Sequence, residues 1–259
     1  MRQIIENIAN NLILANYFYN IYYFIVSPVK FFKHKIFKIK KDNIDLELNK
    51  NGYIKLDNLN SKNFEILKKS LFERFKEKKI INPKKKYLIQ HEISNNEMIE
   101  KINELIDKND VKELAKKYLG FNKLKFRYFF MYSRFDNENY NSLKGSQLFH
   151  TDGVTIKQLK LFINLNEIKK ENGATDIISK DYSKKIFRIS KKKNIIDIKT
   201  QKIDENFFYK TFSDCKIYSL AGPSGEANIV DTSNCYHRGG LMNFGERYLL
   251  MIQILPDII

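Results

Sequence analysis

Three side chains of this 259-residue sequence have the types and spacing that a catalytic metal ion requires. His150 and Asp152 stand two residues apart in the segment FHTDG, and residues i and i+2 of an extended strand point to the same side. The third, His237, ends the strand-like segment EANIVDTSNCYH. Two imidazoles and one carboxylate on one face of a metal leave the opposite positions open, which suits a non-haem Fe(II) that binds an organic co-substrate and dioxygen together. The same ligand types also suit zinc, so a metal enzyme of another kind stays open.

An arginine follows the last of these residues at a short interval. Arg247 lies ten residues beyond His237, after a glycine-rich turn and at the start of the final predicted strand. A hairpin at that turn would bring its guanidinium back beside the metal. An arginine fork holds a carboxylate through two parallel hydrogen bonds, as the distal end of 2-oxoglutarate requires. A metal enzyme that does not use 2-oxoglutarate would leave this arginine without a purpose.

The sequence around these residues resembles the phytanoyl-CoA dioxygenase family of Fe(II)/2-oxoglutarate-dependent oxygenases. The resemblance runs over about residues 51–254. Its specific parts are SQLFHTDG, LKLFINLNEIKKENGATDIISKDY, GPSGEANIVDTSNCYHRGG and ERYLLMIQI. The segment ISKDYSKK (178–185) departs from the Pro-Gly-Ser-His turn that relatives often carry there, and this departure leaves the substrate class open.

The resemblance implies a role for seven residues. His150, Asp152 and His237 would be the catalytic iron ligands, Arg247 would hold the distal carboxylate of 2-oxoglutarate, and Lys160 is the best match for a further co-substrate contact, with Thr232 and Gln147 as weaker candidates. The implied reaction consumes 2-oxoglutarate and O2, releases succinate and CO2, and hydroxylates a C–H bond. Because the carboxylate ligand is present, hydroxylation is favoured over the chemistry of the related halogenases, which lack it.

The residues are compatible with two classes of function. The first is an active hydroxylase of a small-molecule, lipid-linked or glycan-linked substrate. The second is a non-catalytic or membrane-associated binding module that keeps the barrel without the chemistry. The complete ligand set favours the first, since a module freed from catalysis has no need to retain all four residues.

The elements that must position these residues are helices followed by strands. Helical spacing of apolar residues predicts a helix after Ser61 and two more over about 96–106 and 111–118, the last closed by Gly120. Beyond that glycine the pattern alternates, and strands are expected at 123–135, 159–165, EANIVDT and ERYLLMIQIL, besides a short one within 51–59. The expected fold is α+β, with a double-stranded β-helix (jelly-roll, cupin-like) barrel core and flanking N-terminal helices. A lysine-rich stretch, roughly 183–202, is expected to be a solvated excursion over one mouth of the barrel.

Composition narrows the class of protein further. The net charge of +16 comes mostly from lysine spread along the whole chain, whereas arginine is preferred for phosphate recognition, and no zinc-finger or basic-zipper spacing occurs. No nucleic-acid partner is therefore expected. Two cysteines cannot form a disulfide framework, which favours a reducing, cytoplasmic location.

The N-terminal segment, residues 1–41, stands apart from the domain expected over 42–259. It runs uncharged from Asn7 to Val29 and then becomes basic and aromatic in KFFKHKIFKIKK (30–41). The uncharged part has the length of a membrane span, but five asparagines interrupt it, and each amide would be costly in hydrocarbon. Two interpretations stay open: a helix packed on its own domain, or one lying peripherally at the inner face of a membrane.

Overall fold

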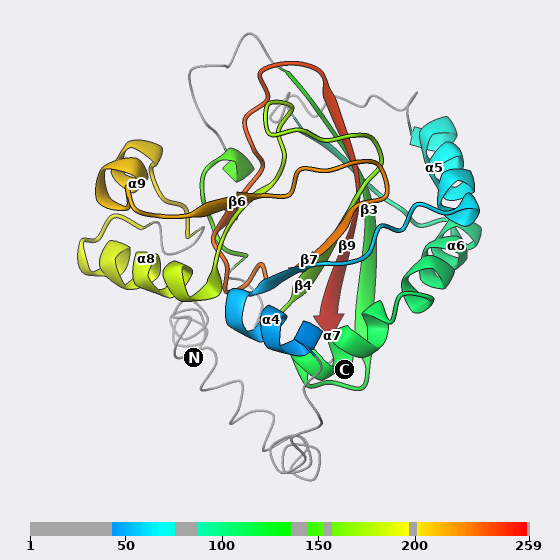
Figure 1. Cartoon of the computed structure of the whole chain (residues 1–259), viewed down its shortest axis with the longest axis horizontal. Coiled ribbons are helices and arrows are strands. Elements are labelled where there is room, and N and C mark those ends of the chain that lie inside the picture. The colour runs from blue at the N-terminus through cyan, green and yellow to red at the C-terminus, as the bar shows by residue number, and fades with distance from the viewer. Residues whose placement is uncertain (1–42, 76–87, 136–144, 153–156, 197–200, 258–259) are drawn as a thin grey trace.

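The computed structural model describes residues 43–75, 88–135, 145–152, 157–196 and 201–257 (Figure 1). Its helices are α4 (Asn43–Asn51), α5 (Lys62–Phe75), α6 (Asn96–Asp107), α7 (Val111–Leu119), α8 (Lys180–Lys192) and α9 (Glu205–Thr211), with a short 3-10 helix η2 (Gly145–Gln147). Its strands are β1 (Tyr53–Lys55), β2 (Leu88–Glu92), β3 (Leu124–Arg134), β4 (Leu159–Asn164), β5 (Asp176–Ile178), β6 (Ile217–Ser219), β7 (Ala227–Val230), β8 (His237–Arg238) and β9 (Glu246–Pro256). The two interpretations of residues 1–41 concern a segment outside the described residues.

The strands form two antiparallel sheets. The larger has the order β1-β7-β4-β9-β3-β2 and the smaller the order β6-β5-β8. An apolar cluster lies between them, with Phe129, Phe162 and Met251 from the larger sheet and Ile177 from the smaller. This arrangement is the predicted double-stranded β-helix, or jelly roll, and the N-terminal helices α4 to α7 flank it.

Along the long strands, side chains point alternately to the two faces of the larger sheet. One face packs against the helices, and the other lines a cavity. On β9, Leu250, Ile252 and Ile254 join the core shared with α5, α6 and α7. Their neighbours Arg247, Leu249, Met251 and Gln253 face the other way and line a cavity between the sheets. Because side chains of a strand point alternately to opposite faces, the apolar pattern that packs the helices also aims the polar residues inward. Figure 1 shows α5 and α6 beside β3, with α8 and α9 on the opposite side beyond β6.

Local signals explain where the helices begin and end. Ser61 Oγ accepts a hydrogen bond from Phe64 N at 3.2 Å, as expected of an N-cap residue. Gly120 closes α7 in the left-handed conformation at φ 78°, which glycine adopts without steric cost. Both ends were predicted from the sequence and are confirmed.

The expectation for the lysine-rich stretch is wrong. Its first half, residues 183–192, belongs to α8, an amphipathic helix whose Ser183, Ile186, Phe187 and Ser190 are buried. Ile186 and Phe187 pack with Phe208 of α9 in a separate core cluster. The four buried residues are spaced so that they fall on one face of the helix, and the charged residues occupy the other faces. The many lysines made this helical spacing difficult to recognise in the sequence.

Candidate metal centre

The two candidate histidines are joined through their backbones. His150 N donates to His237 O at 3.0 Å, and His237 N donates to His150 O at 2.9 Å. This isolated antiparallel bridge brings the two imidazole centroids to 4.5 Å. The backbone alone thus holds His150 and His237 side by side, without the help of a metal ion.

Hydrogen bonds set both imidazoles in the tautomer that a metal needs. His150 Nδ1 lies 2.8 Å from Leu148 O, and His237 Nδ1 lies 3.0 Å from Cys235 O. A carbonyl oxygen can only accept, so each Nδ1 carries the proton and each Nε2 keeps its lone pair. Burial lowers the pKa of both histidines, that of His237 to about 3, against the opposing effect of Asp152. Neutral imidazoles are the form that binds a metal ion.

Asp152 completes the ligand set. Ligand atoms of His150, Asp152 and His237 all lie within 4.8 Å of one another, and His237 Nε2 is 3.6 Å from Asp152 Oδ2. This buried oxygen has no hydrogen bond of acceptable geometry, although Lys160 Nζ lies 2.6 Å away as an ion pair. Burial raises the pKa of Asp152, but Lys160 and the two histidines outweigh it and hold the pKa below its ordinary range. An ionised, buried oxygen beside two imidazole lone pairs fits a divalent cation.

Arg247 is buried, and within the part of the chain that the structure describes it has no carboxylate partner. Its Nη2 donates to Ser133 Oγ at 3.0 Å and its Nη1 to Gly173 O, whereas its buried Nε has no partner. Burial lowers the pKa of Arg247 to about 10, against the weaker opposing effect of Asp176. An unpaired buried cation is costly, so this guanidinium fits an anionic ligand that supplies the missing acceptor.

The neighbouring Arg238 shows the contrast. Its Nε donates to Asp176 at 3.0 Å, its Nη1 to Glu205 at 3.2 Å and its Nη2 to Tyr209 Oη at 3.0 Å. Burial lowers its pKa, but Asp176 and Tyr209 outweigh this effect and raise the pKa above its ordinary value. Judged from the residues that the structure describes, Arg238 is paired within the protein, whereas Arg247 is left to pair with a ligand.

Both arginines and the three candidate ligands line one cavity of about 310 Å³ between the sheets. Its apolar walls come from β2, β3, β4 and β9: Leu88, Phe129, Met131, Phe162, Leu249 and Met251. Polar side chains from the same strands are Gln90, Arg127, Lys160 and Gln253. The cavity has room for 2-oxoglutarate beside part of a second molecule, with apolar surface next to the candidate metal position.

The structure brings together five of the seven predicted site residues. Lys160 lies in the cavity wall beside Asp152, together with the other four. Neither Gln147 nor Thr232 lines the cavity: Gln147 ends η2, and the Thr232 hydroxyl is buried and accepts from Gln158 Nε2 at 3.2 Å. The co-substrate roles of Lys160, Thr232 and Gln147 stay predictions.

Sequence reasoning missed several contributors. Ser133 was read only as part of a strand, yet it lies opposite Arg247 in the β3–β9 register and holds its guanidinium. Arg127, Gln253 and Arg238 also line the cavity. Alternation on β3 and β9 could have assigned Arg127, Ser133 and Gln253 to one face, but only the pairing register places Ser133 beside Arg247.

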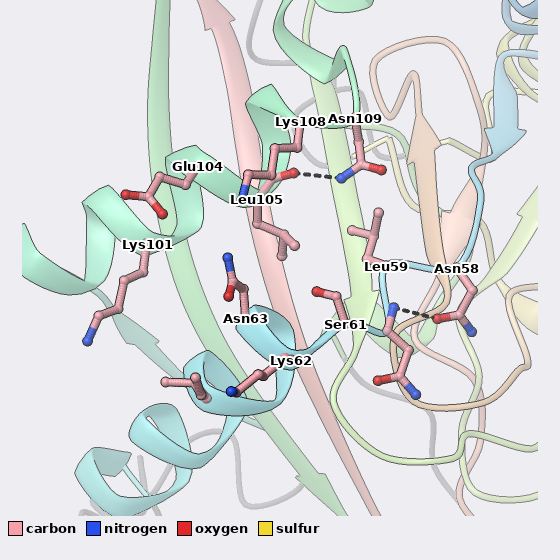
Figure 2. A pocket seen from close by; sticks show the side chains of 12 residues that line it. Asn58, Leu59, Ser61, Lys62, Asn63, Lys101, Glu104, Leu105, Lys108 and Asn109 are labelled. Carbon is pink, nitrogen blue, oxygen red and sulfur yellow. Dashed lines mark hydrogen bonds between the residues drawn. The ribbon is translucent and has the colours of Figure 1, made fainter.

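A second hollow, of about 560 Å³, lies away from these residues (Figure 2). Figure 2 shows the Asn58–Ser61 loop and the start of α5 facing the C-terminal end of α6. The hydrogen bonds within it belong to turns: Asn60 N donates to Asn58 Oδ1, and Asn109 Nδ2 donates to Leu105 O. Its polar side chains are exposed or partly exposed, so it has the character of a solvated surface groove.

Two adjacent glycines of the turn between His237 and Arg247 give a matched test of this packing. Gly240→Ala should destabilise the protein by at least about 2 kcal/mol, because its Cβ would lie 2.1 Å from Ala174 O. Gly239→Ala should cost less than about 1 kcal/mol, since its Cβ would meet Arg247 Nη2 at 3.5 Å, an ordinary contact. Urea denaturation measures both, and equal losses would contradict the close approach at Gly240.

The jelly roll and its enclosed two-histidine, one-carboxylate cluster place this chain in a fold class whose solved members include iron- and 2-oxoglutarate-dependent enzymes. No protein-family model matches the sequence, and no curated protein matches it either. The likeness of this chain to known proteins is therefore one of structure.

Three solved structures illustrate it. The epimerase SnoN, in complex with Fe3+, alpha ketoglutarate and nogalamycin RO, has a TM-score of 0.53 and 11% identity over 83% of this chain and 82% of that chain. EctD from S. alaskensis, with 2-oxoglutarate and 5-hydroxyectoine, has a TM-score of 0.55 and 15% identity over 82% and 74%. HygX from Streptomyces hygroscopicus, with nickel and 2-oxoglutarate bound, has a TM-score of 0.53 and 11% identity over 84% and 87%. At such identities the likeness establishes the fold.

Proposed function

We propose that this chain is an Fe(II)/2-oxoglutarate-dependent dioxygenase that hydroxylates a C–H bond of a small-molecule, lipid-linked or glycan-linked substrate. The observation that carries the proposal is the joint presence, in one cavity, of a three-residue ligand cluster and a buried arginine that pairs with no carboxylate among the described residues. The solved structures of the same fold that contain iron or nickel with 2-oxoglutarate support it.

The residues present fit both groups. His150 Nε2, His237 Nε2 and the ionised Asp152 Oδ2 would hold the metal, and Arg247 would hold the distal carboxylate of 2-oxoglutarate. The bound iron would supply dioxygen activation: 2-oxoglutarate, O2 and a C–H bond become succinate, CO2 and a C–OH group, with 2-oxoglutarate supplying two electrons.

The side chains around the metal position orient the ligands and the co-substrate. Burial keeps the two imidazoles neutral, and the hydrogen bonds from each Nδ1 to a backbone carbonyl fix the tautomer and the orientation of the rings, as metal-binding histidines require. Ser133 orients the Arg247 guanidinium, so that its Nε is left to the co-substrate. The apolar walls from Phe129, Phe162 and Met251 exclude water beside the metal position.

An anaerobic titration with Fe(II) and then 2-oxoglutarate tests the function. We expect the weak visible metal-to-ligand charge-transfer band to appear in the wild-type protein and to be absent in His237→Ala. Bound iron without the band would indicate a metal enzyme that does not use 2-oxoglutarate. Absence of metal binding would contradict the proposal and favour the non-catalytic binding module.

Peripheral membrane contact through residues 1–41 is part of the proposal, at the inner face of a membrane bounding the cytoplasm. Among the residues that the structure describes, no helix combines the length and apolar character needed to cross a bilayer. The basic and aromatic composition of residues 30–41 supports an interfacial contact. Deletion of residues 1–41 should release the protein from anionic vesicles in a sedimentation assay, and unchanged binding after deletion would contradict this contact.

A further inference from the structure

A buried carboxylate outside the cavity anchors the loop that precedes His237. Asp231 is 0% exposed and lies just beyond the end of β7. Its oxygens accept hydrogen bonds from Tyr118 Oη of α7, from Asn234 N at 3.1 Å and from Asn234 Nδ2 at 2.9 Å. Lys180 Nζ of α8 lies 3.7 Å from the same carboxylate. Asp231 therefore ties two helices to the end of a strand at one buried point.

The backbone around Asp231 is equally fixed. Asp231 N donates to Gly52 O at 2.7 Å, and its own carbonyl accepts from Asn234 N at 3.2 Å and from Cys235 N at 2.9 Å. These bonds close a tight turn over residues 231–235. The turn ends two residues before His237, so its geometry determines where β8 begins.

The same turn also holds the other ligand-bearing segment. Thr232 O accepts a hydrogen bond from Asp152 N at 2.8 Å. Thr232 Oγ1 and Ser233 Oγ accept from Gln158 Nε2 and Gln158 N at 3.2 and 3.0 Å. Two of the three candidate ligands are thus placed by one turn: Asp152 by a hydrogen bond to it, and His237 by the chain that leaves it.

We propose that Asp231 is a positioning residue for the metal centre: its carboxylate holds the 231–235 turn, which sets Asp152 against His237. This inference rests on the proposed function, because it assigns a role toward the same metal. It also gives Thr232 a physical role, through its backbone carbonyl and a buried hydroxyl.

The charge of Asp231 matters as well as its shape. An asparagine would keep the volume but replace one acceptor oxygen with a donor amide, facing the donors of Tyr118 and Asn234. It would also leave Lys180 without its anionic partner in a buried setting. The turn would then relax, and outer partners of this kind typically change metal affinity by about 10- to 100-fold.

A titration of the full-length protein with Mn(II), followed by the electron paramagnetic resonance signal of the free ion, tests the inference. We expect Asp231→Asn to weaken Mn(II) binding by about 10- to 100-fold. Tyr118→Phe, which removes one hydrogen bond to Asp231, should weaken it less but in the same direction. The matched control is Leu105→Ala in α6, whose buried side chain packs on the far face of the larger sheet. This variant should lower the melting temperature and leave Mn(II) affinity within about 2-fold.

The outcomes are distinguishable. If wild-type protein binds Mn(II) and Asp231→Asn loses only thermal stability, like Leu105→Ala, the inference is overturned while the proposed function stands. If wild-type protein binds no Mn(II), the proposed function fails and the inference fails with it. If Asp231→Asn does not fold, Tyr118→Phe decides, and unchanged Mn(II) affinity in that variant overturns the inference.

Discussion

Replacing His237 with alanine should lower the affinity for Fe(II) by at least about 100-fold and abolish 2-oxoglutarate turnover. The imidazole supplies one of three ligand atoms, and its loss should exceed the 10- to 100-fold effect typical of an outer partner. Because the ring is buried beside His150, alanine also leaves a space that water can enter. Isothermal titration with Fe(II) under anaerobic conditions and a succinate assay measure the two effects.

His91 provides the matched control for this experiment. It lies on β2 outside the ligand cluster and stacks on Phe75, with ring centroids 5.5 Å apart. His91→Ala should retain Fe(II) affinity within about 2-fold, since only packing is lost. An Fe(II) affinity that survives His237→Ala, or that falls equally in both variants, would contradict the assigned metal site.

The second large effect concerns Arg247. Arg247→Met should weaken 2-oxoglutarate binding by at least about 100-fold, because a buried, charge-assisted pair is worth about 2–5 kcal/mol when one partner is removed. Fe(II) binding without 2-oxoglutarate should change little, since Arg247 is not a ligand. The apo protein should lose little stability, because the substitution also removes a buried cation that pairs with no carboxylate in the described parts of the chain.

Arg247→Lys separates charge from geometry. Lysine keeps the charge but not the planar fork, so we expect only partial recovery of 2-oxoglutarate affinity. Binding can be measured with Fe(II)-loaded protein through the charge-transfer band or by calorimetry. Unchanged 2-oxoglutarate affinity in Arg247→Met would show that the distal carboxylate is held elsewhere, while the metal site would be unaffected.

The strongest periodic signals predicted much of the fold. In β4, Leu159, Leu161 and Ile163 fall on one face, and β9 is an apolar run with the length of a buried strand. The helices α5, α6 and α7 carry regular apolar stripes, so burial on one face predicts both their type and their orientation. The short strands β5, β6 and β8 were beyond such reasoning. With two or three residues each, these strands show no alternation in the sequence, and their pairing in the folded chain defines them.

In the candidate site, too, some features were predicted from the sequence and others were not. His150, Asp152 and His237 stand in recognisable segments, and their clustering was predicted from the spacing and the resemblance. The partners of these residues were not predicted. The hydrogen bond from Asp152 N to the Thr232 carbonyl depends on how the two ligand-bearing segments pair, which residue types do not encode. Likewise, the pairing of Arg238 with Asp176 depends on the register of β5 and β8.

The backbone bridge between His150 and His237 has a thermodynamic consequence. The two residues are 87 positions apart in the sequence, so the ligand cluster exists only after a long loop has closed, and an unfolded chain offers no comparable site. A metal that binds only the folded chain adds stability by mass action, about 2.7 kcal/mol at a 100-fold excess over its dissociation constant. The melting temperature therefore reports occupancy of the cavity. Any compound that binds beside the metal raises it further, which makes thermal shift a search tool for the substrate itself.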